Sequence, residues 1–166
     1  MIVFTSSTLI LFAKAELLDT FLAALDDKVV IPKQVHTECC EEKSSADALL
    51  IQRVIQERKI SVQPLKDKRL YTKILADFSL GKGEAEALAL AVSQTARLFA
   101  TDDRRAIQAS KLLKVHFTTA LAILVRIYEK GLLEKQEARA KLDALRKHGR
   151  YKKDIIEDAK SRLEVT

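Results

Sequence analysis

Glycine and proline are scarce in this sequence, which has only four Gly and two Pro among 166 residues. Tight turns and flexible linkers draw heavily on these residues, so their scarcity argues against an all-β fold and favours long helices joined by short loops. The chain also lacks an apolar run long enough to cross a membrane. Its first residues show neither the basic region nor the cleavage pattern of a signal peptide, and we therefore expect a cytoplasmic protein that is mature from Met1.

Only two cysteines occur, and they are adjacent, at Cys39 and Cys40. Neighbouring cysteines rarely bridge one another, and a single adjacent pair lacks the Cys-x-x-Cys spacing of zinc sites. We expect both thiols to be reduced and to lie in a helix, with one or both buried.

The charge balance is basic, with a net charge of +6 and a pI of about 9.3. A positive balance favours an anionic partner such as nucleic acid. By itself this is weak evidence, because a modest net charge also serves to keep a protein soluble.

Short apolar segments alternate with helical patterns along the chain. Strands are predicted at residues 2–4, 29–32, 60–63, 98–101 and 115–118. Such alternation is typical of a parallel sheet covered by helices on both faces, so we expect an α/β fold. Gly149 is the only boundary that the composition suggests. It would separate a domain of residues 1–150 from a C-terminal helical tail of residues 151–166.

Acidic residues recur where ligands bind in open parallel sheets, beyond the carboxyl ends of the strands. Thr5 follows the first predicted strand, and Glu38 lies on the helix after the second. Glu84 opens a small, apolar helix that we expect to be buried, and Asp102 and Asp103 directly follow the fourth strand. Three of these four sites are therefore acidic, which is not the pattern of random surface charge.

Carboxylates that come close together repel one another, and a hard divalent cation relieves that repulsion. Mg²⁺ and Mn²⁺ prefer oxygen ligands and can activate water or stabilise an attacked phosphate. Each acid also has a purely structural interpretation. Glu84 and Glu86 would then favour a helix N-terminus, Asp102 or Asp103 would cap one, and Glu38 would be a solvated helix residue. The combination of sites, rather than any single residue, indicates a metal-binding pocket.

Four segments resemble the motifs of PIN domains. Residues 3–10 look like the opening of that family, where an aspartate ends the first strand. Residues 32–38 resemble the helix that bears the family's glutamate, and residues 83–91 are similar to its Gly-Glu-Ala-Glu-Ala acidic site. Residues 101–106 resemble its fourth acidic site, and the whole resemblance covers residues 1–150.

The resemblance implies a three-layer α/β/α fold with a central parallel sheet. It also implies a metal-dependent endoribonuclease, like the toxin of VapBC-type toxin–antitoxin pairs, with Mg²⁺ or Mn²⁺ as its cofactor and RNA as its substrate. Such proteins are typically homodimers that a small antitoxin inhibits. Glu38, Glu84 and Asp103 would be the main metal ligands and catalytic residues, with Asp102 in support.

Thr5 departs from the family pattern, because it stands where PIN domains have their first aspartate. A hydroxyl is a neutral and weaker metal ligand than a carboxylate, so metal affinity should fall. Two hypotheses follow. The protein is a metal-dependent ribonuclease, or it is a catalytically weakened or inactive PIN-fold protein that binds RNA or a protein partner.

Two further features concern partners. Residues 141–153 contain six Lys or Arg against one acid, which is either a solvated helix end or an RNA-contacting edge. Residues 121–133 offer more apolar helical surface than one sheet easily covers. Together with the resemblance, this surface predicts a homodimer.

Overall fold

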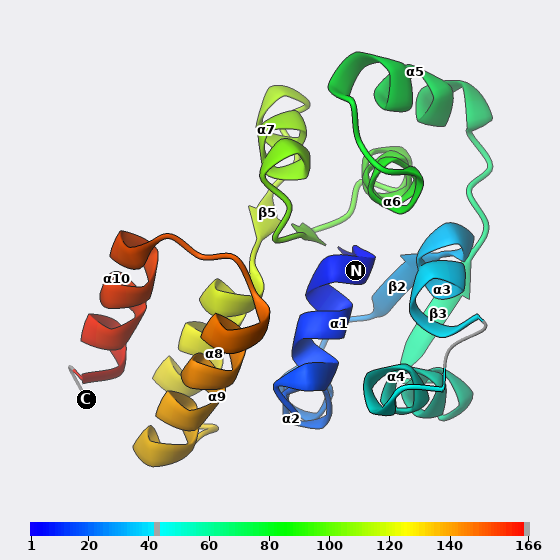
Figure 1. Ribbon diagram of the computed structural model, residues 1–166. Helices are drawn as coiled ribbons and strands as arrows, with labels where there is room; N and C mark the ends of the chain where they lie inside the picture. Colours follow the sequence, from blue (N-terminus) through cyan, green and yellow to red (C-terminus); the bar gives the residue numbers. More distant parts are fainter. Residues whose placement is uncertain (42–43, 165–166) are drawn as a thin grey trace.

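The computed structural model describes residues 1–41 and 44–164, and within them one five-stranded parallel sheet has helices on both faces (Figure 1). The strand order is β3-β2-β1-β4-β5, and every neighbouring pair is parallel. The strands are β1 (Ile2–Phe4), β2 (Val29–Pro32), β3 (Ile60–Gln63), β4 (Leu98–Ala100) and β5 (Phe117–Thr118). The expected α/β fold with a central parallel sheet is therefore confirmed.

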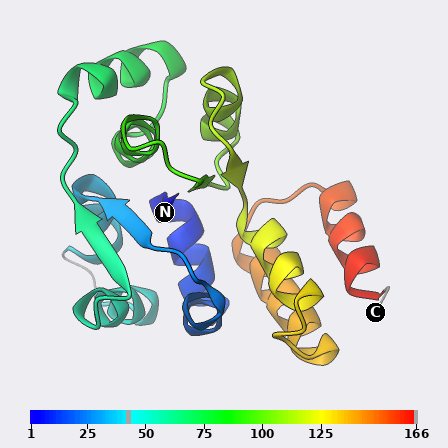
Figure 2. The same ribbon diagram turned by 180° about the vertical axis from the view of Figure 1, so that it is seen from behind.

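The helices form the two outer layers. Helices α5, α6 and α7 cover one face of the sheet, and α1, α2, α4 and the C-terminal helices lie on the other side (Figures 1 and 2). The helices within the described residues are α1 (Ser6–Lys14), α2 (Leu18–Ala24), α3 (Lys33–Cys40), α4 (Ala46–Gln56), α5 (Lys68–Phe78), α6 (Lys82–Ser93), α7 (Arg104–Leu112), α8 (Ala120–Glu129), α9 (Lys135–His148) and α10 (Lys153–Glu164).

The core sits between these layers and explains why the short strands are stable. Strands β1 and β2 are buried along their whole length, as expected for a parallel sheet covered on both faces. On the α1 side, the rings of Phe4, Phe12 and Phe21 pack with centroids 5.2–5.7 Å apart in tilted arrangements. Helix α6 is alanine-rich and buried on most of its surface, so it packs closely against β1, β2 and β4.

The fifth strand is shorter than the predicted 115–118. Lys114 has a left-handed φ of 56° at the end of α7, and the Val115 amide donates to the Ser110 carbonyl at 2.8 Å. The end of the helix thus uses the amide that a longer strand would need. The paired residues of β4 and β5 are Phe99 with Phe117 and Ala100 with Thr118.

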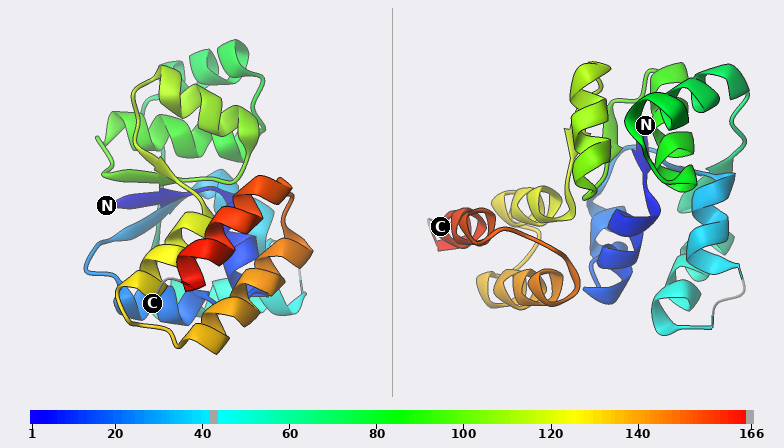
Figure 3. Two further views of the ribbon diagram at one scale, coloured as in Figure 1. Left: turned by 90° about the vertical axis from the view of Figure 1, so that its left-hand side faces the viewer. Right: turned by 45° about the horizontal axis from the view of Figure 1, so that its top comes forward.

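Three C-terminal helices form a group beside the sheet. Helices α8, α9 and α10 lie side by side (Figure 3) and contact one another. Ile156, Ala159 and Leu163 of α10 are buried, so α10 packs on the preceding helices.

Two other expectations can be compared with the structure. Cys39 and Cys40 are both buried in α3 and form no disulfide, as predicted. Among the residues that the structure describes, no helix combines the length and apolar character that a membrane crossing requires.

Candidate functional site

The order of the strands places the site. Along the sheet, the chain moves outward from β1 to β2 and β3, and then returns to the other side of β1 to form β4 and β5. Ligands bind at such a reversal, beyond the carboxyl ends of the two strands that flank it. Here those ends lead into Thr5 after β1 and into Thr101, Asp102 and Asp103 after β4.

Glu38 lies in α3 and links three helices. Its Oε2 accepts a hydrogen bond from the Ser6 hydroxyl of α1 at 2.6 Å, and its Oε1 accepts from the Gly83 amide of α6 at 3.0 Å. The close approach to α6 depends on a glycine, because a Cβ at Gly83 would lie 2.6 Å from the carboxyl carbon of Glu38. Glu38 is therefore seated at the N-terminus of α6, where the helix dipole favours a negative charge.

Glu84 lies one residue further along α6 and closes the first turn of that helix. Its Oε2 accepts a hydrogen bond from the Gly81 amide at 2.8 Å. Burial raises the pKa of Glu84; the Gly81 hydrogen bond opposes the rise, and the charges of Asp103 and Glu38 add to it. Glu84 thus lies within electrostatic range of both other acids.

Asp103 is the N-cap of α7. Its Oδ1 accepts a hydrogen bond from the Ala106 amide at 2.8 Å, and its own amide donates to the Thr101 hydroxyl at 3.2 Å. The structural interpretation of Asp103 as a cap is therefore correct. This cap uses only one carboxylate oxygen, Oδ1, and Asp103 also lines the pocket described below.

Asp102 is buried and has a different environment. Its carboxylate accepts hydrogen bonds from the Thr8 hydroxyl at 2.6 Å, the Tyr151 hydroxyl at 2.8 Å and the Ala120 amide at 3.1 Å. Burial raises the pKa of Asp102, and these three donors oppose the rise. The Tyr151 contact was not anticipated from the sequence, where this residue is simply an aromatic within a basic run.

The side chains of Thr5 and Glu86 both form hydrogen bonds with backbone groups. The fully buried Thr5 hydroxyl donates to the Ala100 carbonyl at 3.1 Å and lies 3.2 Å from the Ser7 hydroxyl. Glu86 accepts a hydrogen bond from the Gln34 amide at 2.7 Å, in the first turn of α3. Thr5 therefore bridges the ends of β1 and β4, and Glu86 stabilises the start of a neighbouring helix.

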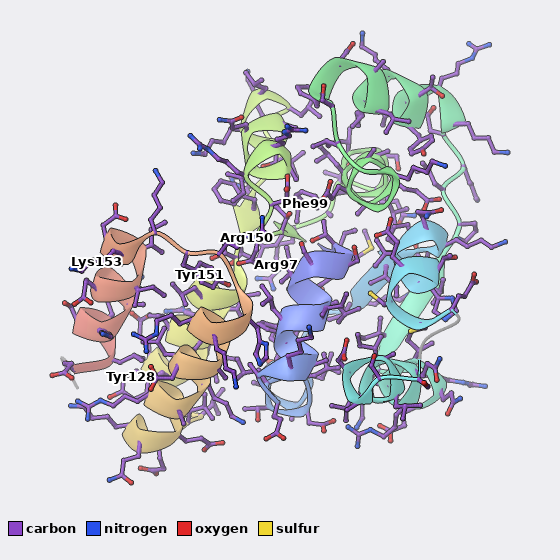
Figure 4. The ribbon with its side chains drawn as sticks, viewed as in Figure 1. Arg97, Phe99, Tyr128, Arg150, Tyr151 and Lys153 are labelled. Atoms are coloured by element: carbon purple, nitrogen blue, oxygen red, sulfur yellow. The ribbon has the colours of Figure 1, made fainter. Side chains whose placement is uncertain are left out.

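A cavity of about 310 Å³ opens beside these acids, and we refer to it as the acidic pocket. Acidic and basic side chains both line it. Of the basic residues, Lys14 belongs to α1, His148 ends α9, and Arg150 lies beside Tyr151 on the connection between α9 and α10 (Figure 4). The lining residues are Ser7, Ile10, Leu11, Lys14, Glu84, Asp102, Asp103, His148, Gly149, Arg150 and Tyr151. Glu38 is not among them, although its charge acts on Glu84.

The donor set suits a hard divalent cation in its chemistry and its charge. Glu38, Glu84 and Asp103 supply carboxylate oxygens. Burial is the main cause of the raised pKa of Glu84, and the like charges of Asp103 and Glu38, which a cation would relieve, add to it. Within residues 1–41 and 44–164, however, no three His, Cys, Asp or Glu side chains are grouped closely enough to hold an ion. Binding would therefore require these three side chains to rotate toward a common point.

The family of the chain is shown by a comparison with family models. A PIN-domain model matches residues 1–164. The chain belongs to the PIN-domain family. Comparisons with curated proteins and with solved structures found no match. Membership indicates a nuclease type of protein with RNA as the class of substrate, and PIN domains typically depend on divalent metal ions.

Replacing Glu84 by glutamine should stabilise the metal-free PIN domain at neutral pH. Glutamine keeps an acceptor for the Gly81 amide and removes the charge that burial, Asp103 and Glu38 disfavour. Because the folded pKa of Glu84 lies above the unfolded value of 4.5, ionisation costs stability as the pH rises from that value through the folded pKa. Thermal melts in a chelator should place Glu84→Gln a few degrees above the wild type at pH 7.5. An equal gain at pH 4 would contradict this explanation.

Replacing Gly83 by alanine should displace Glu38 without unfolding the protein. The new Cβ meets the mobile end of the Glu38 side chain, and alanine in a helix is more favourable than glycine by up to about 1 kcal/mol. We expect an unchanged or higher melting temperature in the absence of metal and a smaller stabilisation by Mn²⁺. In a Glu38→Gln background, Gly83→Ala should have little further effect on that stabilisation. Full retention of the Mn²⁺ effect by Gly83→Ala alone would refute the role given to Gly83.

Proposed function

We propose that this PIN-domain protein is a metal-dependent endoribonuclease, the toxin of a toxin–antitoxin pair, with Glu38, Glu84 and Asp103 as the main ligands of Mg²⁺ or Mn²⁺. The observation that supports the proposal most strongly is electrostatic. Burial raises the pKa of Glu84, and the charges of Asp103 and Glu38 raise it further, at the reversal of the strand order and beside a cavity large enough for a phosphate group. Asp102 supports this set, and its role is considered separately below.

Different residues would have different roles in the proposed cleavage of RNA. A bound Mg²⁺ or Mn²⁺ would supply Lewis-acid activation of water and of the attacked phosphate. Glu38, Glu84 and Asp103 would hold that ion, and Glu84 would do so through Oε1, because its Oε2 accepts a hydrogen bond from the Gly81 amide. Lys14 and Arg150, which line the same pocket, would bind the non-bridging phosphate oxygens of the substrate.

The basic side of the pocket supports RNA as the substrate. Lys14, His148 and Arg150 line the same cavity as Glu84 and Asp103. Part of the basic run of residues 141–153 therefore lines the pocket, which favours its interpretation as an RNA-contacting edge over that of a solvated helix end. Basic side chains would bind the phosphate backbone of the RNA next to the acidic residues at which cleavage takes place, as the proposed function requires.

Arg150→Ala should weaken RNA binding and make that binding less dependent on salt. Each phosphate contact that is lost removes about 0.7 from the slope of log K against log salt for a single strand. Binding is measured with Asp103→Asn protein in both cases, so that cleavage does not interfere. The matched control is Lys66→Ala, an exposed cation that is not among the pocket residues. Equal effects of the two substitutions would exclude a specific role for Arg150.

A second candidate function is a PIN-fold module that binds RNA or protein without cleavage. Two observations favour it: the Thr5 hydroxyl already donates a hydrogen bond to the Ala100 carbonyl, and in the described residues no three acids converge on one point.

We also propose a homodimer and a small antitoxin as partners, and both rest on the family resemblance. Helices α9 and α10 cover much of the apolar surface of α8, so a dimer would have to use other surfaces, such as that around the exposed Leu132.

Thr5→Asp distinguishes the two functions. In the metal-free protein, the new carboxylate would face the Ala100 carbonyl and the existing acids, so the melting temperature should fall by several degrees. If the pocket binds metal, Mn²⁺ should stabilise Thr5→Asp more than the wild type, and RNA cleavage should rise. Thr5→Asn, which has a similar shape and no charge, is the control. The absence of any Mn²⁺ effect in all three proteins would reject the nuclease and leave the binding module.

A further inference from the structure

Asp102 joins four separate segments of the fold. It follows β4, and its carboxylate accepts hydrogen bonds from Thr8 of α1, from the first amide of α8 at Ala120, and from Tyr151 between α9 and α10. We propose that Tyr151 is a positioning residue that acts through Asp102, and that Asp102 is an anchor of the acidic pocket rather than one of its cation ligands. The first part rests on geometry alone, and the second rests on the proposed function.

The distribution of hydrogen bonds over the two carboxylate oxygens supports the anchor role. Oδ2 of Asp102 accepts from Thr8 at 2.6 Å and from Ala120 at 3.1 Å, whereas Oδ1 accepts from Tyr151 at 2.8 Å and from Ala120 at 3.3 Å. An ionised carboxylate has about four acceptor positions, so these contacts occupy nearly all of them. A cation at Asp102 would have to displace one of the donors. Asp103, in contrast, uses only Oδ1 to cap its helix.

The donor at Tyr151 is a stable one. Burial raises the pKa of the Tyr151 phenol, and the nearby charge of Asp102 raises it further, so the hydroxyl remains a hydrogen-bond donor at neutral pH. A hydrogen bond to a buried carboxylate is stronger than one between neutral groups. Its loss would leave the buried charge of Asp102 with fewer donors.

The backbone on both sides of Tyr151 fixes the position of its hydroxyl. A Cβ at Gly149 would overlap the Tyr151 ring and would lie 2.9 Å from the Leu145 carbonyl, so glycine allows the chain to turn closely after α9. On the other side, α10 is fixed by its buried residues against α8 and α9. The connection is thus held at both ends, with Tyr151 directed at Asp102 from 49 residues away.

The same region of the chain places basic side chains on the pocket. His148 and Arg150 flank Gly149 and line the cavity together with Asp102 and Asp103. The Tyr151–Asp102 hydrogen bond therefore couples the basic side of the pocket to the acidic side. Its loss should allow Arg150 to move away from Asp103 even though neither residue has changed.

The first test uses metal-free protein and requires no activity. Tyr151→Phe removes only the hydroxyl and should lower the melting temperature by about 4 °C, whereas Tyr71→Phe, at a half-buried tyrosine of α5, should not. If Tyr151 acts through Asp102, adding Tyr151→Phe to Asp102→Asn should cost clearly less than it costs in the wild type. Additive effects would overturn the proposal. If Asp102→Asn does not fold, a second double-mutant cycle combines Thr8→Val with Tyr151→Phe, because both residues donate to Asp102. Additive losses of stability in that cycle would also overturn the proposal.

The second test separates the anchor from a ligand. Mn²⁺ should still raise the melting temperature of Asp102→Asn and Tyr151→Phe, and it should not raise that of Asp103→Asn. Tyr151→Phe should lower kcat/KM for RNA cleavage about tenfold, as expected for displaced groups, and part of that loss should appear as a higher KM because Arg150 moves with the connection. Loss of the Mn²⁺ effect in Asp102→Asn, equal to that in Asp103→Asn, would make Asp102 a ligand and overturn the anchor role. A wild type without any Mn²⁺ effect or cleavage would refute the proposed nuclease, while the metal-free cycle would still decide whether Tyr151 acts through Asp102.

Discussion

The reversal of strand order between β1 and β4 is the constraint on which the acidic pocket depends. Parallel strands end at one edge of a sheet, and at a reversal the two flanking connections leave in opposite directions and open a space between them. Here the chain fills that edge with Thr5 on one side and with Asp102 and Asp103 on the other. Because β1 pairs with β4 in register from Ile2 to Phe4, the positions of these residues follow directly from the pairing of buried, apolar strands.

Negative charge at this edge is tolerated because each carboxylate has its own hydrogen-bond donors. Glu38 relies on a hydroxyl and on the first turn of α6, Glu84 on the amide of Gly81, and Asp103 on the first turn of α7. Helix N-termini stabilise anions through their unpaired amides and the helix dipole. The structural and functional interpretations of these acids are therefore compatible, since the same amides that make them caps also allow them to stay charged close together.

Much of the fold could be predicted from the sequence, because strand and helix periodicities are local. The short apolar segments predicted β1, β2 and β3 with their observed bounds, and the small apolar helix after Gly83 is buried as α6. Contacts between distant side chains could not be predicted in this way. No periodicity indicates that Tyr151 reaches Asp102, that Glu86 stabilises the start of α3, or that the Thr5 hydroxyl bridges two strands. These features depend on rotamers and on packing between layers.

The position of a bound cation tests the central claim most directly. A crystal structure of the protein soaked in Mn²⁺, with anomalous diffraction recorded at a wavelength sensitive to manganese, would locate that ion without reference to activity. We predict a peak among the carboxylates of Glu38, Glu84 and Asp103, with oxygen distances close to those that such hard cations adopt, near 2.1 Å for Mg²⁺, and with the Tyr151–Asp102 hydrogen bond intact. A peak elsewhere, or none at saturating Mn²⁺, would contradict the proposal that the acidic pocket of this PIN domain is a metal centre.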